Sequence, residues 1–278
     1  MTLTIALVSD VFHDEGGATR LAERLGDAQA RGAALAVLPE LPLNAWSPAT
    51  KTPHDADAEP PDGPRHQALS RAARDAGIAV VGGAIVRDPK TSRRHNTALV
   101  FDKAGRLVSS YRKLHLPAEH GFWETHHYEP GDELPTVIDH FPLRIGVQVC
   151  SDINRPEVSH LLGAMGAEVI INPRATEAAT FHRWRTVLIA NAMTSGSYVV
   201  SVNRAREEFG VPFGGPSFAV APTGEVLVET TDAIALVTLD RDVVRQARRE
   251  YPGYLAHRAD LYANGWRKVK ATTLPLSS

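Results

Sequence analysis

Short apolar runs alternate with amphipathic segments from the start of the chain to about residue 250. Short runs of this kind, bounded by turn residues, are typical of buried strands, whereas Leu21, Leu25 and Ala28 recur on one face of a helix. The pattern predicts strands at 3–9, 35–38, 78–86, 96–101, 107–111, 143–149, 168–171, 198–203, 217–221, 226–229 and 233–239. It predicts helices at 18–32, 64–77, 155–166, 181–195 and 241–251.

The connections between these segments predict mixed sheets. Turn residues at 102–105 and 222–225 favour hairpins, whereas helices join most other strands as crossovers. We therefore expect a layered α/β fold, with residues 1–278 as one domain. Its compact core is expected to cover about 3–251, and a tail of mixed composition at 252–278 is a candidate for packing on a partner subunit.

Composition narrows the classes of partner. A net charge of −2 with scattered basic residues argues against nucleic acid or an anionic membrane as partner. No apolar run approaches the roughly 20 residues of a membrane helix, and the N-terminus is typical of a strand rather than a signal peptide. The single cysteine excludes an internal disulfide and favours a cytoplasmic location.

Three predicted strands each lead into a reactive residue. Glu40, Lys113 and Cys150 follow the apolar or β-rich runs 35–38, 107–111 and 143–149. Strand ends at one edge of a sheet are where α/β folds gather functional groups, so we expect the three side chains to meet in one pocket.

These residue types suit nucleophilic catalysis. A thiol is mostly protonated at neutral pH, and a carboxylate such as Glu40 can accept its proton as attack begins. Lys113 and the backbone N–H of Ser151 can then stabilise the negative charge of a tetrahedral intermediate. The product of this step is a thioester on Cys150, which water hydrolyses.

An ordered set of motifs resembles the nitrilase-like carbon–nitrogen hydrolase superfamily. The central motifs are LPE at 38–40, YRKLHLP at 111–117 and GVQVCSD at 146–152, followed by RPE at 155–157. Further matches are YEPGD at 128–132, GAEVIINP at 166–173, VNR at 202–204 and SFAVAPTGE at 217–225. The resemblance covers about residues 3–245.

The resemblance implies roles and a fold. It makes Glu40 the general base, Lys113 the electrostatic stabiliser and Cys150 the nucleophile. It also implies a second glutamate, for which Glu124 fits best and Glu119 and Glu129 are alternatives. The family fold is a four-layer αββα sandwich with two mixed β-sheets, which forms homodimers or larger homo-oligomers through its helical faces. Many relatives carry an aromatic residue after the cysteine, whereas this chain has Ser151.

Other residues leave two interpretations open. Arg174 follows a predicted strand and either binds a substrate carboxylate or forms a structural salt bridge. Trp46 and Trp123 either line the pocket or belong to the core or an interface.

The histidines of one region raise two further possibilities. Their spacing lacks the pattern of a zinc site, and no nucleotide-binding glycine motif occurs, so we expect neither a metal nor a cofactor. A thiol enzyme with His115 or His127 as base is the closer alternative. The histidines concerned are His115, His120, His126 and His127.

These patterns predict a cytoplasmic amidohydrolase. The expected substrate is a small linear amide or N-carbamoyl compound, which the enzyme cleaves to release ammonia or an amine. A nitrilase, an acyltransferase with the same triad and a non-catalytic binding protein are the alternatives.

Overall fold

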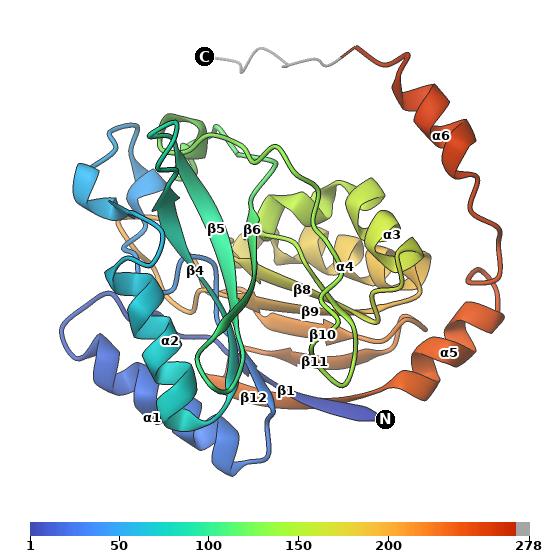
Figure 1. The fold of residues 1–278 in the computed structure, drawn as a ribbon, viewed down its shortest axis with the longest axis horizontal. Coiled ribbons are helices and arrows are strands. Elements are labelled where there is room, and N and C mark those ends of the chain that lie inside the picture. The colour runs from blue at the N-terminus through green and yellow to red at the C-terminus, as the bar shows by residue number, and fades with distance from the viewer. Residues whose placement is uncertain (271–278) are drawn as a thin grey trace.

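Two β-sheets packed face to face form the centre of the protein in the computed structural model, which describes residues 1–270 (Figure 1). Side chains from both sheets fill the space between them, including Ile5 and Val81 from one sheet and Ile171 and Val200 from the other. Burial of such apolar side chains is the main favourable contribution to folding.

The larger sheet has seven strands in the order β12-β1-β2-β4-β5-β6, with β3 paired to β4. The neighbours β1, β2 and β4 are parallel, whereas β12 and β5 run antiparallel to β1 and β4, and β6 runs antiparallel to β5. The bounds are β1 Thr2–Val8, β2 Leu35–Val37, β3 Ala58–Glu59, β4 Ala79–Arg87, β5 Arg94–Phe101, β6 Leu107–Arg112 and β12 Ile234–Asp240.

The smaller sheet has five strands in the order β11-β10-β9-β8-β7. The neighbours β7, β8 and β9 are parallel, and β10 and β11 complete the sheet as an antiparallel hairpin. The bounds are β7 Ile145–Val147, β8 Val169–Arg174, β9 Tyr198–Asn203, β10 Ser217–Val220 and β11 Val226–Thr230.

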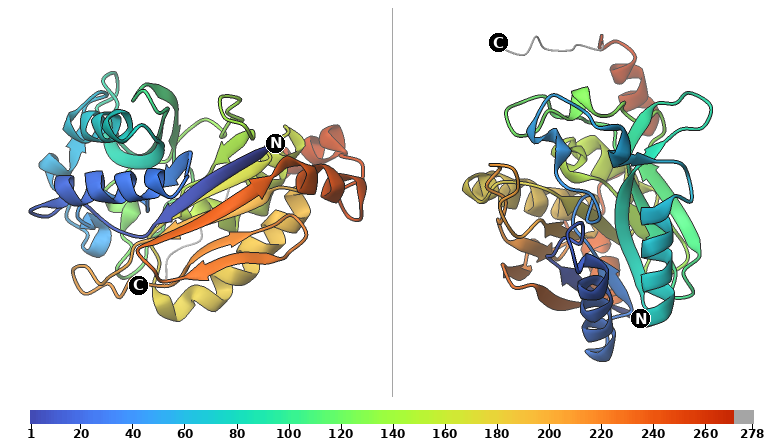
Figure 2. Two further views of the ribbon diagram at one scale, coloured as in Figure 1. Left: turned by 90° about the horizontal axis from the view of Figure 1, so that it is seen from below. Right: turned by 90° about the vertical axis from the view of Figure 1, so that its left-hand side faces the viewer.

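Helices cover the outer faces of both sheets. Leu25 of α1 (Gly17–Ala30) and Leu69 of α2 (Pro64–Ala76) pack on the larger sheet. Leu162 of α3 (Pro156–Ala164) and Leu188 of α4 (Phe181–Ser195) pack on the smaller one. The two helix pairs therefore lie on opposite sides of the molecule (Figures 1 and 2), which confirms the predicted four-layer αββα sandwich.

The C-terminal part differs from the prediction. After α5 (Arg241–Arg249) a further helix, α6 (Ala259–Trp266), stands away from the sheets (Figure 1). Its Tyr262 and Trp266 are more than half exposed. The predicted tail 252–278 thus contains a helix that its mixed composition did not indicate, and its last residues, 271–278, lie outside the described part.

Other boundaries moved by a few residues. The predicted strand 143–149 shortens to β7, and the short strand β3 lies where no strand was predicted. Across residues 1–270, no helix combines the length and the apolar character needed to cross a bilayer.

Candidate active site

The ends of three strands bring Glu40, Lys113 and Cys150 into the interior. Glu40 lies just beyond β2, Lys113 directly follows β6, and Cys150 opens a 3-10 turn after β7. Their exposed fractions are 2%, 1% and 3%, so all three are shielded from bulk solvent. Two of these strands belong to the larger sheet and one to the smaller, so the face-to-face packing of the sheets assembles the cluster.

The ammonium of Lys113 is enclosed by two carboxylates. Its Nζ donates to Glu40 Oε1 at 2.8 Å and to both oxygens of Glu124, at 2.7 and 2.8 Å. Glu124 is fully buried and supplies the second glutamate, whereas the alternatives Glu119 and Glu129 are exposed. The other oxygen of Glu40, Oε2, is buried without a hydrogen-bond partner among residues 1–270.

Burial and mutual charge set the ionisation of this cluster. Burial opposes the charge of Lys113, but the carboxylates of Glu124 and Glu40 outweigh it and hold the pKa of the ammonium well above its usual value. Burial raises the pKa of Glu124 to about 8; Lys113 opposes this increase and the charge of Glu40 adds to it. Burial, then the charges of Glu40 and Glu124, raise the pKa of the Cys150 thiol well above its usual value, while Lys113 lowers it. A free Cys150 therefore carries a protonated thiol that needs a base.

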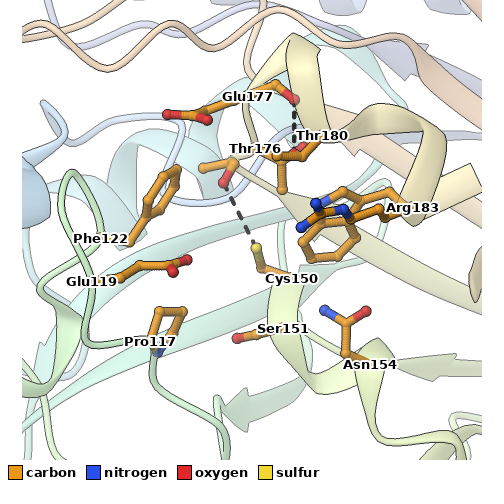
Figure 3. A pocket seen from close by; sticks show the side chains of 12 residues that line it. Pro117, Glu119, Phe122, Cys150, Ser151, Asn154, Thr176, Glu177, Thr180 and Arg183 are labelled. Atoms are coloured by element: carbon orange, nitrogen blue, oxygen red, sulfur yellow. Dashed lines mark hydrogen bonds between the residues drawn. The ribbon is translucent and has the colours of Figure 1, made fainter. Parts of the chain in front are cut away.

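Cys150 faces a cavity of about 240 Å³ (Figure 3). Its φ of 45° is in the left-handed region, which side chains other than glycine rarely adopt, and its Sγ donates to Ala175 O at 3.8 Å. The lining residues are Pro117, Glu119, Phe122, Cys150, Ser151, Asn154, Ala175, Thr176, Glu177, Thr180, Arg183 and Trp184. Ser151 thus lines the cavity beside the thiol of Cys150.

The cavity carries charge that the sequence analysis missed. Glu119 and Arg183 approach it from opposite sides of Cys150, and Glu177 lies above the thiol in the view of Figure 3. Phe122 and Trp184 supply apolar walls. No local sequence signal marks Arg183 or Glu177, because the loop after β8 and the start of α4 meet the cavity only in the folded chain.

Asp152 links the 3-10 turn that begins at Cys150 to β6, the strand that leads to Lys113. Its fully buried carboxylate accepts from Tyr111 Oη at 2.8 Å, from Val149 N at 3.1 Å and from His115 N at 2.9 Å. These contacts join β6 of the larger sheet to the turn after β7 of the smaller one. Asp152 therefore fixes the turn carrying Cys150 against the strand carrying Lys113.

The two histidines considered as alternative bases are engaged elsewhere. His115 Nδ1 bonds Asp152 Oδ1 at 2.9 Å, and His127 Nε2 donates to Thr50 O at 2.7 Å. Neither side chain is among the residues lining the cavity. Within residues 1–270, no cluster of histidine, cysteine and acidic side chains is arranged to hold a metal ion.

Arg174 is a buried cation apart from the cavity. Its guanidinium donates to Ser201 Oγ at 2.9 Å and also bonds Thr176 Oγ1 and Pro216 O. Among residues 1–270 no carboxylate forms an ion pair with it, and it does not line the cavity. Burial lowers its pKa to about 10, and the nearby Cys150 opposes this shift.

Trp46 and Trp123, the two tryptophans considered as pocket residues, also lie outside the cavity lining. Trp46 is fully buried, donates from Nε1 to Gly121 O at 2.8 Å and meets the Phe122 ring edge-on at 5.8 Å. Trp123 is half-buried, with Lys51 Nζ 4.0 Å from its ring centroid. Trp46 therefore supports the Phe122 wall from behind.

The sheet sandwich thus encloses a thiol, carboxyl groups and an ammonium in one buried cluster, a set of groups suited to nucleophilic catalysis. The model of the family described as carbon-nitrogen hydrolase matches residues 7–249. The chain therefore belongs to the carbon–nitrogen hydrolase family, within the nitrilase superfamily.

Individual relatives agree with this assignment. The chain is 29% identical over 259 residues to the human omega-amidase NIT2, covering 90% of this chain and 92% of that one. It is 35% identical over 200 residues to an (R)-stereoselective amidase of a Pseudomonas species, covering 70% and 69%.

Solved structures share the fold. Nit3 of Saccharomyces cerevisiae, a member of the nitrilase superfamily, has a TM-score of 0.80 at 26% identity, covering 93% of this chain and 96% of that one. A carbon-nitrogen hydrolase from Helicobacter pylori has a TM-score of 0.83 at 22% identity, covering 96% and 99%. The family match accordingly makes this chain a hydrolase of carbon–nitrogen bonds.

Proposed function

We propose that the protein hydrolyses small amides through a thioester on Cys150, with Glu40, Lys113 and Glu124 completing the site. The observation that carries the proposal is the arrangement of Lys113, held by two carboxylates, in the same buried cluster as a thiol that opens into a cavity. The relatives named as amidases support the choice of an amide.

In this mechanism Glu40 is the general base. Its unpaired Oε2 accepts the Cys150 proton while Sγ attacks the amide carbon. Lys113 Nζ and the backbone N–H of Ser151 stabilise the resulting oxyanion. Glu40 then returns the proton to the amide nitrogen and the C–N bond breaks. Ammonia departs, and the acyl group remains on Cys150 as a thioester.

Water completes the cycle. Glu40 accepts a proton from a water molecule while the water oxygen attacks the thioester carbon. When the second tetrahedral intermediate collapses, the C–S bond breaks, Glu40 returns the proton to Sγ, and the carboxylic acid is released. Glu124 acts through Lys113, since both of its oxygens bind Nζ and hold the ammonium in place.

The cavity supports a small substrate. Its volume of about 240 Å³ is below the ~300–1,000 Å³ typical of drug-sized ligand sites. A short linear amide or N-carbamoyl compound fits this size better than a peptide or a nucleotide. We propose that the protein works as a homo-oligomer in the cytoplasm, as its sequence led us to expect, without a metal or cofactor.

Ammonia release from a substrate panel tests this function. The panel contains short amides, N-carbamoyl amines, N-carbamoyl amino acids and nitriles, and Cys150→Ala is assayed beside the parent protein. We expect the parent to release ammonia from an amide or carbamoyl compound and the variant to release none. Equal rates in the two proteins would exclude Cys150 as nucleophile.

The same panel separates the alternatives. A preference for nitriles would identify a nitrilase, and product formation only with an added amine acceptor would identify an acyltransferase. A Cys150 thiol that stays inert to alkylating reagents, with no turnover of any compound, would favour a binding protein.

A further inference from the structure

Asn96 links the two ionised side chains of the cluster within the larger sheet. It lies in β5, between β4 and β6, and only 2% of its surface is exposed. Its Nδ2 donates to Glu40 Oε1 at 2.8 Å, and its backbone carbonyl accepts from the backbone N–H of Lys113 at 2.9 Å. A single residue is therefore bonded to Glu40 and to Lys113.

We infer that Asn96 is a positioning residue, which orients the carboxylate of Glu40 so that Oε2 is free to take the proton of Cys150. The inference rests on the proposed role of Glu40 as general base. The amide of Asn96 is bonded to Glu40 Oε1, so it acts through Glu40 rather than on the substrate.

The hydrogen bonds of Glu40 are divided unequally between its two oxygens. Oε1 accepts from Asn96 Nδ2 and from Lys113 Nζ, both at 2.8 Å. Oε2 is buried without a partner among residues 1–270. A buried acceptor without a partner is costly, so a fold that retains one at a reactive site keeps it for a proton that arrives during the reaction.

Lys113 alone cannot give this orientation. Its ammonium is a point charge on a flexible stem, and it also binds both oxygens of Glu124. The amide of Asn96 is planar and short, and its backbone is held on both sides by strand pairing with Ile85 of β4 and by the bond to Lys113. Two donors at different angles on Oε1 fix the plane of the carboxylate, whereas one donor leaves it free to rotate.

Other titratable groups act on Glu40 and are unchanged by a substitution at Asn96. They come from the end of β6, the 3-10 turn at 124–126 with the residues after it, the 3-10 turn that begins at Cys150, and the end of β9. Those acting on the carboxylate are Lys113, Glu124, Tyr128 and Cys150, whereas Arg204 donates to the backbone carbonyl of Glu40.

The rate of Cys150 alkylation by iodoacetamide, measured from pH 5 to 10, tests the inference. The chain has one cysteine, so mass spectrometry of the modified protein reports this thiol alone. We expect Asn96→Ala to slow the reaction at pH 7 by roughly 10- to 150-fold, the range for a lost hydrogen bond to a charged group. Asn96→Asp places a second carboxylate beside Glu40. In this variant the alkylation rate should therefore begin to rise at a higher pH than in Asn96→Ala.

Steady-state hydrolysis of the best amide gives a second readout. Both variants should lower kcat while KM stays within about twofold of the parent value, because Asn96 does not touch the cavity. Thr97→Val is the matched control, since it removes a buried hydroxyl from the next position of β5 that bonds only His95 O. It should keep the alkylation profile of the parent.

Two results would overturn the inference. One is a folded Asn96→Ala protein that reacts at the rate and pH profile of the parent. The other is a loss of reactivity in Thr97→Val equal to that in Asn96→Ala, which would indicate a general disturbance of β5. Absence of turnover in the parent protein would refute the proposed function but leave the alkylation test of Asn96 valid.

Discussion

Lys113 illustrates how a buried charge depends on its neighbours. Its side chain is fully buried, and all three of its hydrogen bonds go to the carboxylates of Glu40 and Glu124. Such a group is stable only because its desolvation is offset by two nearby negative charges. The same groups keep the ammonium protonated, so in the proposed mechanism Lys113 stabilises the oxyanion by its charge and does not accept a proton.

Removal of this ammonium should harm both stability and activity. Lys113→Met leaves two buried carboxylates facing each other, so we expect a loss of about 3–5 kcal/mol in the free energy of unfolding and no measurable turnover. Urea denaturation and ammonia release check this. The double variant Lys113→Met/Glu124→Gln removes one of the two buried carboxyl groups and should recover part of the stability without recovering activity. A Lys113→Met protein as stable as the parent would contradict the mutual stabilisation of the buried ammonium and its carboxyl partners.

Glu124 predicts a pH dependence of stability. Its pKa in the folded protein is about 8, raised from 4.5, so between these values the folded state binds more protons than the unfolded state. The contribution of Glu124 to stability is therefore fully present below about pH 4.5 and declines as pH rises to about 8. In urea denaturation at pH 5, 6, 7 and 8, Glu124→Gln should show a shallower decline than the parent. Parallel curves for the two proteins would contradict the raised pKa.

At the scale of elements, Arg204 at the end of the smaller sheet holds a loop of the larger one. Its guanidinium donates to Glu40 O at 2.9 Å and to Asn44 O at 2.8 Å, and it pairs with Glu208 at 2.7 Å. It also lies 5.4 Å from the centroid of Trp46, whose ring backs the cavity wall. The backbone of Glu40 is thus fixed from the opposite sheet, while Asn96 fixes its carboxylate.

This contact predicts a selective effect of a conservative change. Arg204→Lys keeps the charge but loses the planar fork, so we expect a loss of about 1–3 kcal/mol in stability and a decrease in kcat as the loop of Glu40 loosens. Thermal unfolding and steady-state kinetics measure both. Arg206→Lys is the control: its side chain is 53% exposed and pairs with Asp14, so its effect should stay within about 0.5 kcal/mol. Equal effects of the two substitutions would contradict the prediction.

The sequence predicted elements better than contacts. Apolar periodicity located most strands and the first five α-helices, and the motifs at their ends identified Glu40, Lys113 and Cys150. The sequence did not identify Asn96, whose side chain donates a hydrogen bond to Glu40, 56 positions away. Such pairs depend on strand register and sheet packing, which local patterns do not encode. The partners of Arg174 were unpredictable for the same reason, because its position at the end of β8 does not reveal that its donors bind Ser201, Thr176 and Pro216.

At the scale of the whole molecule, the packed sheets leave one wall of the cavity to loops and to the start of α4. Those segments supply Glu119, Glu177 and Arg183, whereas the sheet ends supply the reactive cluster. We therefore expect chemistry and substrate choice to depend on different parts of the fold. Substitutions in the loops should change which amide is preferred while the reaction stays the same.

Matched substrates of different charge check this division. We expect Arg183→Gln to lower kcat/KM for succinamate by about 2- to 5-fold and to leave butyramide unchanged, because an exposed ion pair contributes ~0.2–1 kcal/mol. Glu119→Gln should act in the opposite sense and lower kcat/KM for 4-aminobutyramide. Steady-state ammonia release measures all three. Equal effects on the neutral and the charged amides would show that these side chains do not sense charge.

The pairing of β1 with β12 sets when this protein can fold during its synthesis. Leu3 lies opposite Leu239, so β1 finds its antiparallel neighbour only after the chain has been synthesised through β12. Until then β1 has one unpaired edge, which is a template for aggregation. A chain that stops before residue 234 lacks that neighbour for good. Termination of translation before residue 234 should therefore yield aggregated protein rather than a shorter enzyme.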